Sequence, residues 1–181
     1  TQYQFQPQAG ETLAWVGRIA PEKGLEDAVI AALKLNRPLK IWGALQDEIY
    51  WQDICDQYPD APVTYAGFLP TAELQHELGH CAAMLMTPRW VEAFGNVAIE
   101  AMACGVPVIA YRRGGPSEII QHGKTGWLVD PDRVEGLVAA IAQIEQIQRA
   151  DCRQYVEETY SLAAMGDRLE AWFESILELR L

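Results

Sequence analysis

The stretch EAFGNVAIEAMACGVPVIA, residues 92–110, joins a helix to a buried strand and so decides the fold class. We expect the helix to begin at Asn96 or Val97. The run VPVIA that follows is continuously apolar, as in a strand buried on both faces. Glu100 lies in VAIEAMAC, where every other residue is apolar. Because burying an unpaired charge costs several kcal/mol, we expect Glu100 to have a partner.

The same alternation extends in both directions along the chain. Apolar runs followed by helical stretches lie at 12–17, 39–43, 62–69, 82–88, 106–111 and 125–130. Buried strands that alternate with helices indicate a parallel sheet covered on both faces. The predicted fold is therefore α/β, a Rossmann-like, doubly wound parallel sheet of six strands. Such sheets bind ligands at the carboxyl ends of their strands, near the switch in strand order.

The last part of the chain is predicted to be mainly helical, from about Asp132 onward, with a break near Tyr160–Ser161. The break divides the chain into one domain over 1–160 and a final helix over 161–181. The final helix carries an apolar stripe at helical spacing. Its members are Met165, Leu169, Trp172, Phe173, Ile176 and Leu177.

The composition excludes some classes of protein. The 181 residues include 14 Lys and Arg against 25 Asp and Glu, a net charge of −11, which argues against a nucleic-acid binder. No run reaches the roughly 18 apolar residues of a membrane span, and no signal peptide opens the chain. Cys55, Cys81, Cys104 and Cys152 are widely spaced, which indicates reduced thiols and a cytoplasmic protein. Because the chain begins at Thr1 without methionine, we expect a piece of a longer protein.

The turn VGRIAPEKG, residues 16–24, is the first candidate site. Gly17 and Gly24 permit a tight backbone, and Arg18 and Lys23 extend from the end of the first strand. Two cations beside a helix N-terminus favour a diphosphate, because the guanidinium, the ammonium and the backbone N–H groups all bind its oxygens. The turn is not G-x-G-x-x-G, so no nicotinamide cofactor is indicated. An ordinary turn with surface cations is the alternative.

The loop TPRWVEAFGN, residues 87–96, is the second candidate site. We expect Asn96 to cap the helix, with the N–H groups of Gly95–Val97 open to a phosphate or a sugar hydroxyl. Glu92 lies on the loop, and Glu100 lies about one turn into the helix, where it can accept hydrogen bonds from a diol. The alternatives are a solvated loop acid at Glu92 and a carboxylate at Glu100 paired with arginine or backbone donors.

Four segments carry a resemblance to a known family. VGRIAPEKG, YAGFLPTAEL, TPRWVEAFGNVAIEAMACGVPVIAYRRGGPSEII and HGKTGWLVDP occur in the order and spacing of the retaining glycosyltransferases of family 4. They resemble the C-terminal half of that GT-B fold, which binds the nucleotide sugar. The resemblance covers nearly the whole chain, and its most specific part is Glu92 and Glu100 with the following EAMACGVPVIA.

The resemblance implies a role for each matching residue. Arg18 and Lys23 would grip the donor diphosphate, and Glu92 would bind the transferred sugar. Glu100 would hold the ribose. The remaining donor-binding residues implied are Gly17, Ala93, Phe94, Gly95, Asn96 and Val97, together with Gly43, Phe68 and Leu69, which would border the nucleobase. The segment IWGALQDE lacks the second glycine often present after strand two, which leaves the base pocket around Gly43 less defined.

The resemblance also implies the reaction and the partners. A hexose would pass from a UDP-glucose-like donor, or another UDP- or GDP-sugar, to an unidentified acceptor with retention of configuration. Fixed cations stabilise the charge that develops on the leaving diphosphate, so no metal and no cofactor are expected. An N-terminal domain of the same polypeptide would bind the acceptor, and the helix over 161–181 would cross back toward it. Membrane association would arise only through that domain.

Other functions compete with this interpretation. HELGH, residues 76–80, satisfies the zinc-peptidase pattern, and Glu100 follows His80 at a spacing that a third zinc ligand can have. A metallopeptidase through His76, Glu77 and His80 is the remote alternative. A non-catalytic nucleotide-sugar-binding domain or a GT-B sugar-nucleotide epimerase is the nearer one. A phosphorylase would need a lysine for pyridoxal phosphate, and no surrounding segment supports one.

The segment DPD, residues 130–132, imitates the metal-binding D-x-D of the other large glycosyltransferase fold. It follows the last predicted strand and precedes the helical run RVEGLVAAI. We interpret Asp132 as the N-cap of that helix.

The implied missing domain leads to a prediction. We expect the 181-residue chain alone to bind nucleotide weakly and to transfer no sugar, because the acceptor groups would lie elsewhere. Titration with nucleotides and a transfer assay check this expectation. Measurable sugar transfer by the isolated chain would contradict it.

Overall fold

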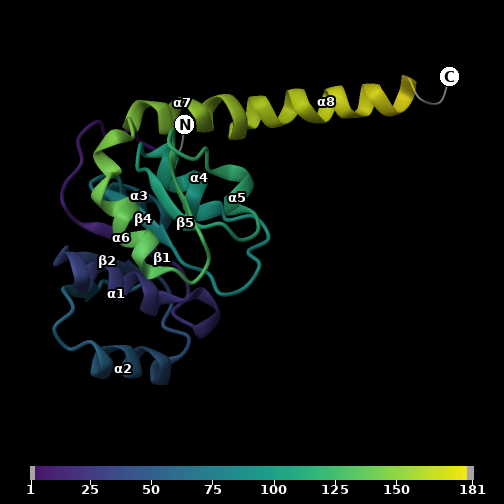
Figure 1. Ribbon diagram of the computed structural model, residues 1–181. Helices are drawn as coiled ribbons and strands as arrows, with labels where there is room; N and C mark the ends of the chain where they lie inside the picture. The colour runs from purple at the N-terminus through teal and green to yellow at the C-terminus, as the bar shows by residue number, and fades with distance from the viewer. Residues whose placement is uncertain (1–2, 179–181) are drawn as a thin grey trace.

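The computed structural model describes residues 3–178 and contains one parallel sheet of six strands (Figure 1). The strands are β1 Leu13–Val16, β2 Leu39–Trp42, β3 Val63–Tyr65, β4 Ala83–Met86, β5 Val108–Tyr111 and β6 Gly126–Val129. Their order is β3-β2-β1-β4-β5-β6, and every neighbouring pair is parallel. This is the doubly wound order, with its switch point between β1 and β4. The predicted fold is confirmed.

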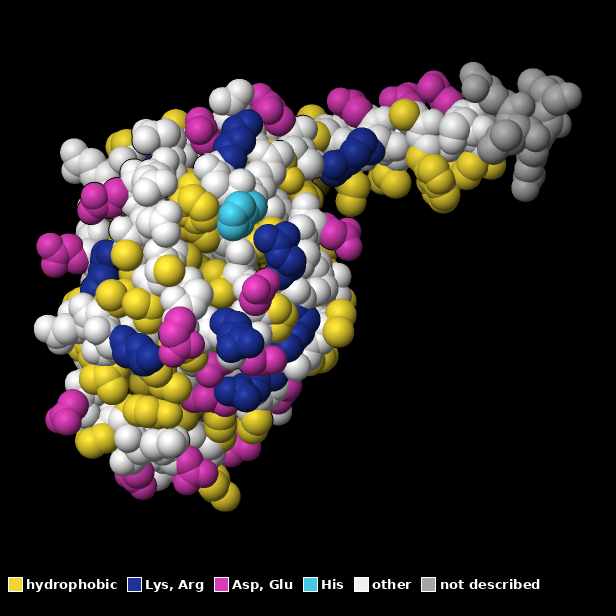
Figure 2. Space-filling model, viewed as in Figure 1, with side chains coloured by type: hydrophobic (Ala, Val, Ile, Leu, Met, Phe, Trp, Pro, Cys, Tyr) yellow, Lys and Arg dark blue, Asp and Glu magenta, His cyan; other side chains and the backbone are white. Residues whose placement is uncertain are grey.

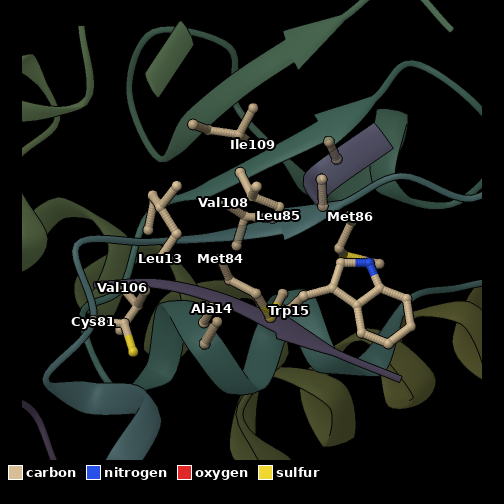
Figure 3. Close-up of a cluster of buried hydrophobic side chains, with 14 of the residues drawn as sticks. Leu13, Ala14, Trp15, Cys81, Met84, Leu85, Met86, Val106, Val108 and Ile109 are labelled. Carbon is tan, nitrogen blue, oxygen red and sulfur yellow. The ribbon is translucent and has the colours of Figure 1, made fainter. Parts of the chain in front are cut away.

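The central strands are buried on both faces, which explains why their sequences do not alternate. All four residues of β4 and of β5 are buried. Figure 3 shows the side chains of β1, β4 and β5 gathered in one cluster. The edge strand β3 is shorter than its apolar run predicted, and none of its residues is fully buried.

Each strand is followed by a helix, and two further α-helices end the described part of the chain. The α-helices are α1 Leu25–Leu35, α2 Glu48–Gln57, α3 Thr71–Gly79, α4 Asn96–Ala103, α5 Pro116–Ile119, α6 Val134–Ala142, α7 Arg149–Tyr160 and α8 Leu162–Glu178. Right-handed crossovers place α1 and α4, which lie on either side of the switch point, on opposite faces. α6 packs beside α1, whereas α3 and α7 pack beside α4.

The last helix leaves the body of the domain, as Figure 1 shows. Ser161 is extended, with φ −68° and ψ 160°, and separates α7 from α8. The predicted break at Tyr160–Ser161 is therefore confirmed, while the domain boundary drawn there stays a prediction. Residues 179–181 of the predicted final helix lie outside the described residues.

Two predicted helix caps are wrong. Gly95, at φ 97°, is the N-cap of α4, so Asn96 is already the first helical residue and its side chain makes no capping bond. α6 begins only at Val134, one residue too late for Asp132 to cap it. The carboxylate of Asp132 instead accepts two hydrogen bonds from Arg113, at 2.7 and 3.3 Å.

A buried carboxylate ties the first helix to the sheet. Asp27, 5% exposed, lies in the first turn of α1, where the helix dipole stabilises a negative charge. It accepts hydrogen bonds from Tyr111 Oη at 2.7 Å and from Arg89 Nη2 at 3.2 Å. Burial, together with the hydrogen bond to Asp27, raises the pKa of Tyr111. The phenol therefore stays protonated and keeps donating.

All four cysteines lie within the described residues and are free thiols. Cys81, Cys104 and Cys152 are buried, whereas Cys55 is partly exposed. Burial raises the pKa of Cys81 to about 12 and that of Cys104 to about 11. None of the helices in the described part of the chain has the length and apolarity that crossing a bilayer requires.

Gly43 provides a test of how closely β1 and β2 approach at their carboxyl ends. Its φ is 138°, and a Cβ there would lie 1.8 Å from the carbonyl oxygen of Gly17. We expect Gly43→Ala to lower the free energy of unfolding by about 3 kcal/mol or more, because the backbone itself must move. Denaturant unfolding measures this loss.

Gly67→Ala is the matched control. Gly67 also has a positive φ, 77°, but a Cβ there would meet nothing within 4 Å. Only backbone strain of about 1 kcal/mol is expected. Equal losses in the two variants would show that the approach of Gly43 to Gly17 is not the constraint described.

Candidate functional site

A pocket of about 410 Å³ opens at the switch point of the sheet. The carboxyl ends of β1 and β4 form its floor, and the loop before α4 forms one side. It brings together most of the predicted site residues: Gly17, Arg18, Lys23, Glu92, Ala93, Phe94, Gly95, Asn96 and Val97. The location agrees with the expectation for a doubly wound sheet.

The turn that carries Lys23 is clamped against the end of β4. Gly24, at φ 62°, packs so closely that a Cβ would lie 2.1 Å from the carbonyl oxygen of Thr87. The hydroxyl of Thr87 donates to the carbonyl of Gly24 at 2.7 Å, and the N–H of Arg89 donates to the carbonyl of Glu22 at 2.9 Å. These contacts fix the start of the lysine side chain relative to the second loop.

Thr87 is a site residue that the sequence analysis did not identify. Its side chain is 1% exposed, and its oxygen also accepts a hydrogen bond from Trp15 Nε1 at 3.3 Å. The sequence does place the hydroxyl of Thr87 at the end of the apolar run AAMLMTP. A polar group buried there needs hydrogen-bond partners, which could have indicated a structural role. Those partners come from β1 and from the turn after it.

Lys23 and Glu92 form an ion pair inside the pocket. Lys23 Nζ lies 2.5 Å from Glu92 Oε2, and the two side chains are only 19% and 16% exposed. Two predicted site residues far apart in the sequence are therefore in direct contact. A partly buried pair of this kind is screened less by salt than a pair in open solvent. Because Lys23 is already bound to Glu92, any anion that binds Lys23 must compete with this carboxylate.

Arg18 lies at the more exposed side of the pocket. Its side chain is 47% exposed, donates to Gln46 Oε1 and lies 3.4 Å from Glu22. Exposed pairs of this kind contribute little to stability. The guanidinium can therefore exchange these partners for a ligand at small cost.

The N-terminus of α4 supplies a third set of donors. The first N–H groups of a helix have no partner within the helix, and its dipole favours an anion. Gly95, Asn96 and Val97 place these groups in the lining of the pocket. Ammonium, guanidinium and backbone N–H groups thus surround one cavity, and Glu92 is the one acidic side chain among its lining residues.

Three predicted base-binding residues lie outside the lining of this pocket. Gly43 meets Gly17 through the backbone and accepts a hydrogen bond from Tyr65 Oη at 2.9 Å. Phe68 is 73% exposed. Leu69 lines a separate groove beside Trp42. Gly43 thus borders the site, whereas the base contacts of Phe68 and Leu69 stay predictions.

Glu100 differs from its expected environment. The carboxylate is only partly buried and does not line the pocket with Glu92. Its partner is Tyr3, since burial together with the charge and hydrogen bond of Glu100 raises the pKa of Tyr3 to about 12. The premise that Glu100 is buried among apolar residues is therefore wrong, because its side of α4 faces the N-terminal segment. Its role toward a ribose stays a prediction.

The peptidase-like segment HELGH lies on α3 and its C-terminal end. The rings of His76 and His80 are 4.9 Å apart, and His80 Nδ1 is 2.7 Å from the carbonyl oxygen of His76. Glu77 is bound by Lys40, whose hydrogen bond lowers the pKa of that carboxyl. Within residues 3–178, no cluster of three or more His, Cys, Asp or Glu is arranged to hold a metal ion.

Comparison with known proteins gives consistent matches. The family model of the glycosyl transferases group 1 matches residues 4–161. Sucrose synthase from Solanum tuberosum is 32% identical over 107 residues, 54% of this chain and 13% of that protein. Glycogen synthase from Mycobacterium tuberculosis is 34% identical over 138 residues, 73% of this chain and 33% of that protein. The crystal structure of Anabaena HepE in complex with UDP and glucose has a TM-score of 0.79 at 22% identity and covers 92% of this chain.

These matches concern only part of the related proteins. The chain spans about a third or less of the two curated relatives and 48% of the HepE chain. The structural similarity confirms the predicted GT-B type of α/β fold. Since the family model covers most of its length, the chain belongs to the group 1 glycosyl transferases.

Proposed function

We propose that this chain is the donor-binding domain of a retaining glycosyltransferase of family 4, which moves a hexose from a nucleotide-diphosphate sugar to an acceptor. The observation that carries the proposal is the pocket at the switch point. It gathers Arg18, Lys23 and the N-terminus of α4 around one cavity together with Glu92. Cations suit a diphosphate, and a carboxylate suits sugar hydroxyls.

The same groups account for the chemistry. Breaking the bond between sugar and diphosphate leaves negative charge on the departing phosphate oxygens. Arg18, Lys23 and the N–H groups of α4 would stabilise that charge once Lys23 exchanges Glu92 for the diphosphate. We therefore expect the reaction to need no metal ion. Glu92 would hold the sugar while the bond breaks.

We take the donor to be a UDP-hexose. The HepE crystal structure is described as a complex with UDP and glucose, and its fold matches this chain. A GDP-sugar is the second candidate, because the base-binding residues Gly43, Phe68 and Leu69 do not form one defined pocket. The free buried thiols support a cytoplasmic protein.

We propose that a second, N-terminal domain of the same polypeptide binds the acceptor. α8 offers it a surface, because its apolar side chains line one side of the projecting helix (Figure 2). Met165, Leu169 and Trp172 are 51%, 46% and 56% exposed. An apolar stripe of this extent on a helix favours a protein partner.

The diphosphate assignment is tested with Arg18→Ala. Calorimetric titration of the chain with UDP, GDP and ADP measures the affinity and the base preference. We expect UDP to bind best and Arg18→Ala to bind it roughly tenfold more weakly, since a hydrogen bond to a charged group contributes about 1.5–3 kcal/mol and Arg18 is half exposed.

Arg133→Ala is the control, because it removes the same charge from an exposed arginine that lines a different cavity. It should leave the UDP affinity unchanged. Equal UDP binding by wild type and Arg18→Ala would remove Arg18 from the site. Failure of the wild type to bind any nucleotide would overturn the proposed function.

A further inference from the structure

Trp90 contacts both members of the ion pair in the pocket, although its side chain is absent from the predicted site. Its indole Nε1–H donates to Glu92 Oε2 at 3.2 Å. The ammonium of Lys23 lies over the indole, 4.7 Å from the ring centroid. Trp90 is 42% exposed and is not itself one of the residues that line the pocket, so it contacts the ion pair from outside that lining.

Both donors bind the same carboxylate oxygen. Lys23 Nζ and Trp90 Nε1 both meet Glu92 Oε2, and within residues 3–178 the other oxygen, Oε1, receives no hydrogen bond. In the function proposed above, a donor diphosphate draws Lys23 toward its own oxygens. Trp90 is then the side chain that still holds Glu92 Oε2, while Oε1 remains open to a sugar hydroxyl.

We propose that Trp90 is a positioning residue, which keeps Glu92 oriented toward the transferred sugar when Lys23 turns to the diphosphate. This inference rests on the proposed function. The indole suits the task because it is a rigid donor with no acceptor of its own. It also attracts the ammonium through its ring face without a directional bond, so Lys23 can move between the two anions.

The backbone on both sides of Trp90 is anchored, which fixes the position from which the indole side chain starts. Arg113 Nη1 donates to the carbonyl of Pro88 at 2.8 Å, and the N–H of Arg89 is bonded to Glu22. On the other side, the N–H of Gly115 donates to the carbonyl of Glu92 at 2.7 Å. The loop is thus held both before and after Trp90.

The test separates the sugar from the nucleotide. The chain is titrated with UDP, GDP and ADP and with UDP-glucose, GDP-mannose and ADP-glucose, and the ratio of the affinities for a nucleotide sugar and its diphosphate gives the contribution of the sugar. We expect Trp90→Phe to lower this ratio roughly tenfold, because a hydrogen bond to a carboxylate is lost, and to change diphosphate affinity less than about twofold.

Two variants serve as controls. Trp127→Phe makes the same substitution on β6, where the indole packs against His122, lines a different cavity and has no hydrogen-bond partner for its Nε1 among the described residues; both affinities should stay at the wild-type level. Trp90→His can restore an N–H donor, so it should recover part of the sugar contribution. Thermal unfolding of all variants should coincide with the wild type.

The outcomes distinguish the two proposals. If the wild type binds nucleotide sugars as expected and Trp90→Phe shows the same sugar contribution, the role of Trp90 is overturned and the proposed function stands. An equal loss of diphosphate and sugar affinity also overturns that role, since a positioning role toward Glu92 affects only the sugar. If the wild type binds none of the nucleotide sugars more tightly than the matching diphosphate, Glu92 does not bind the sugar, and the role of Trp90 is overturned as well. No binding of any nucleotide overturns the proposed function and the inference with it.

Discussion

The pairing of β1 with β4 is the constraint on which the rest of the structure depends. Leu13, Ala14 and Trp15 pair with Ala83, Met84 and Leu85, so two strands distant in the sequence become neighbours at the centre of the sheet. The turn after β1 and the loop after β4 then emerge side by side. Every contact within the pocket, including that between Lys23 and Glu92, follows from this pairing.

Buried polar side chains convert that adjacency into a defined geometry. Thr87 connects the end of β4 to Trp15 and Gly24, and Asp27 connects the first turn of α1 to Tyr111 and to the loop after β4. Each group is satisfied, which matters because an unpaired polar atom in the interior costs about 1–3 kcal/mol. The apolar core determines which strands are neighbours, and these hydrogen bonds determine how the loops between them are held.

The sequence was sufficient for features that depend on local pattern. Continuous apolar runs identified all six strands, and the two loops with cations and carboxylates identified most of the pocket. It was insufficient where a contact joins distant segments. Trp90 and Thr87 acquire their roles only when β4 lies beside β1, and Glu100 meets Tyr3 only because the N-terminal segment passes over α4. The caps at Asn96 and Asp132 failed because they depend on where a helix begins to within one residue.

Because Ser161 is extended and separates α7 from α8, the direction of α8 relative to the sheet depends on the backbone angles at this residue. The helix has 17 residues, so it is roughly 25 Å long, and a rotation of about 10° at its base moves the far end by about 4 Å. A body attached along the apolar stripe would be displaced by a similar amount relative to the sheet. A change in the backbone angles of Ser161 would thus alter the width of a cleft between the sheet and a body attached to α8.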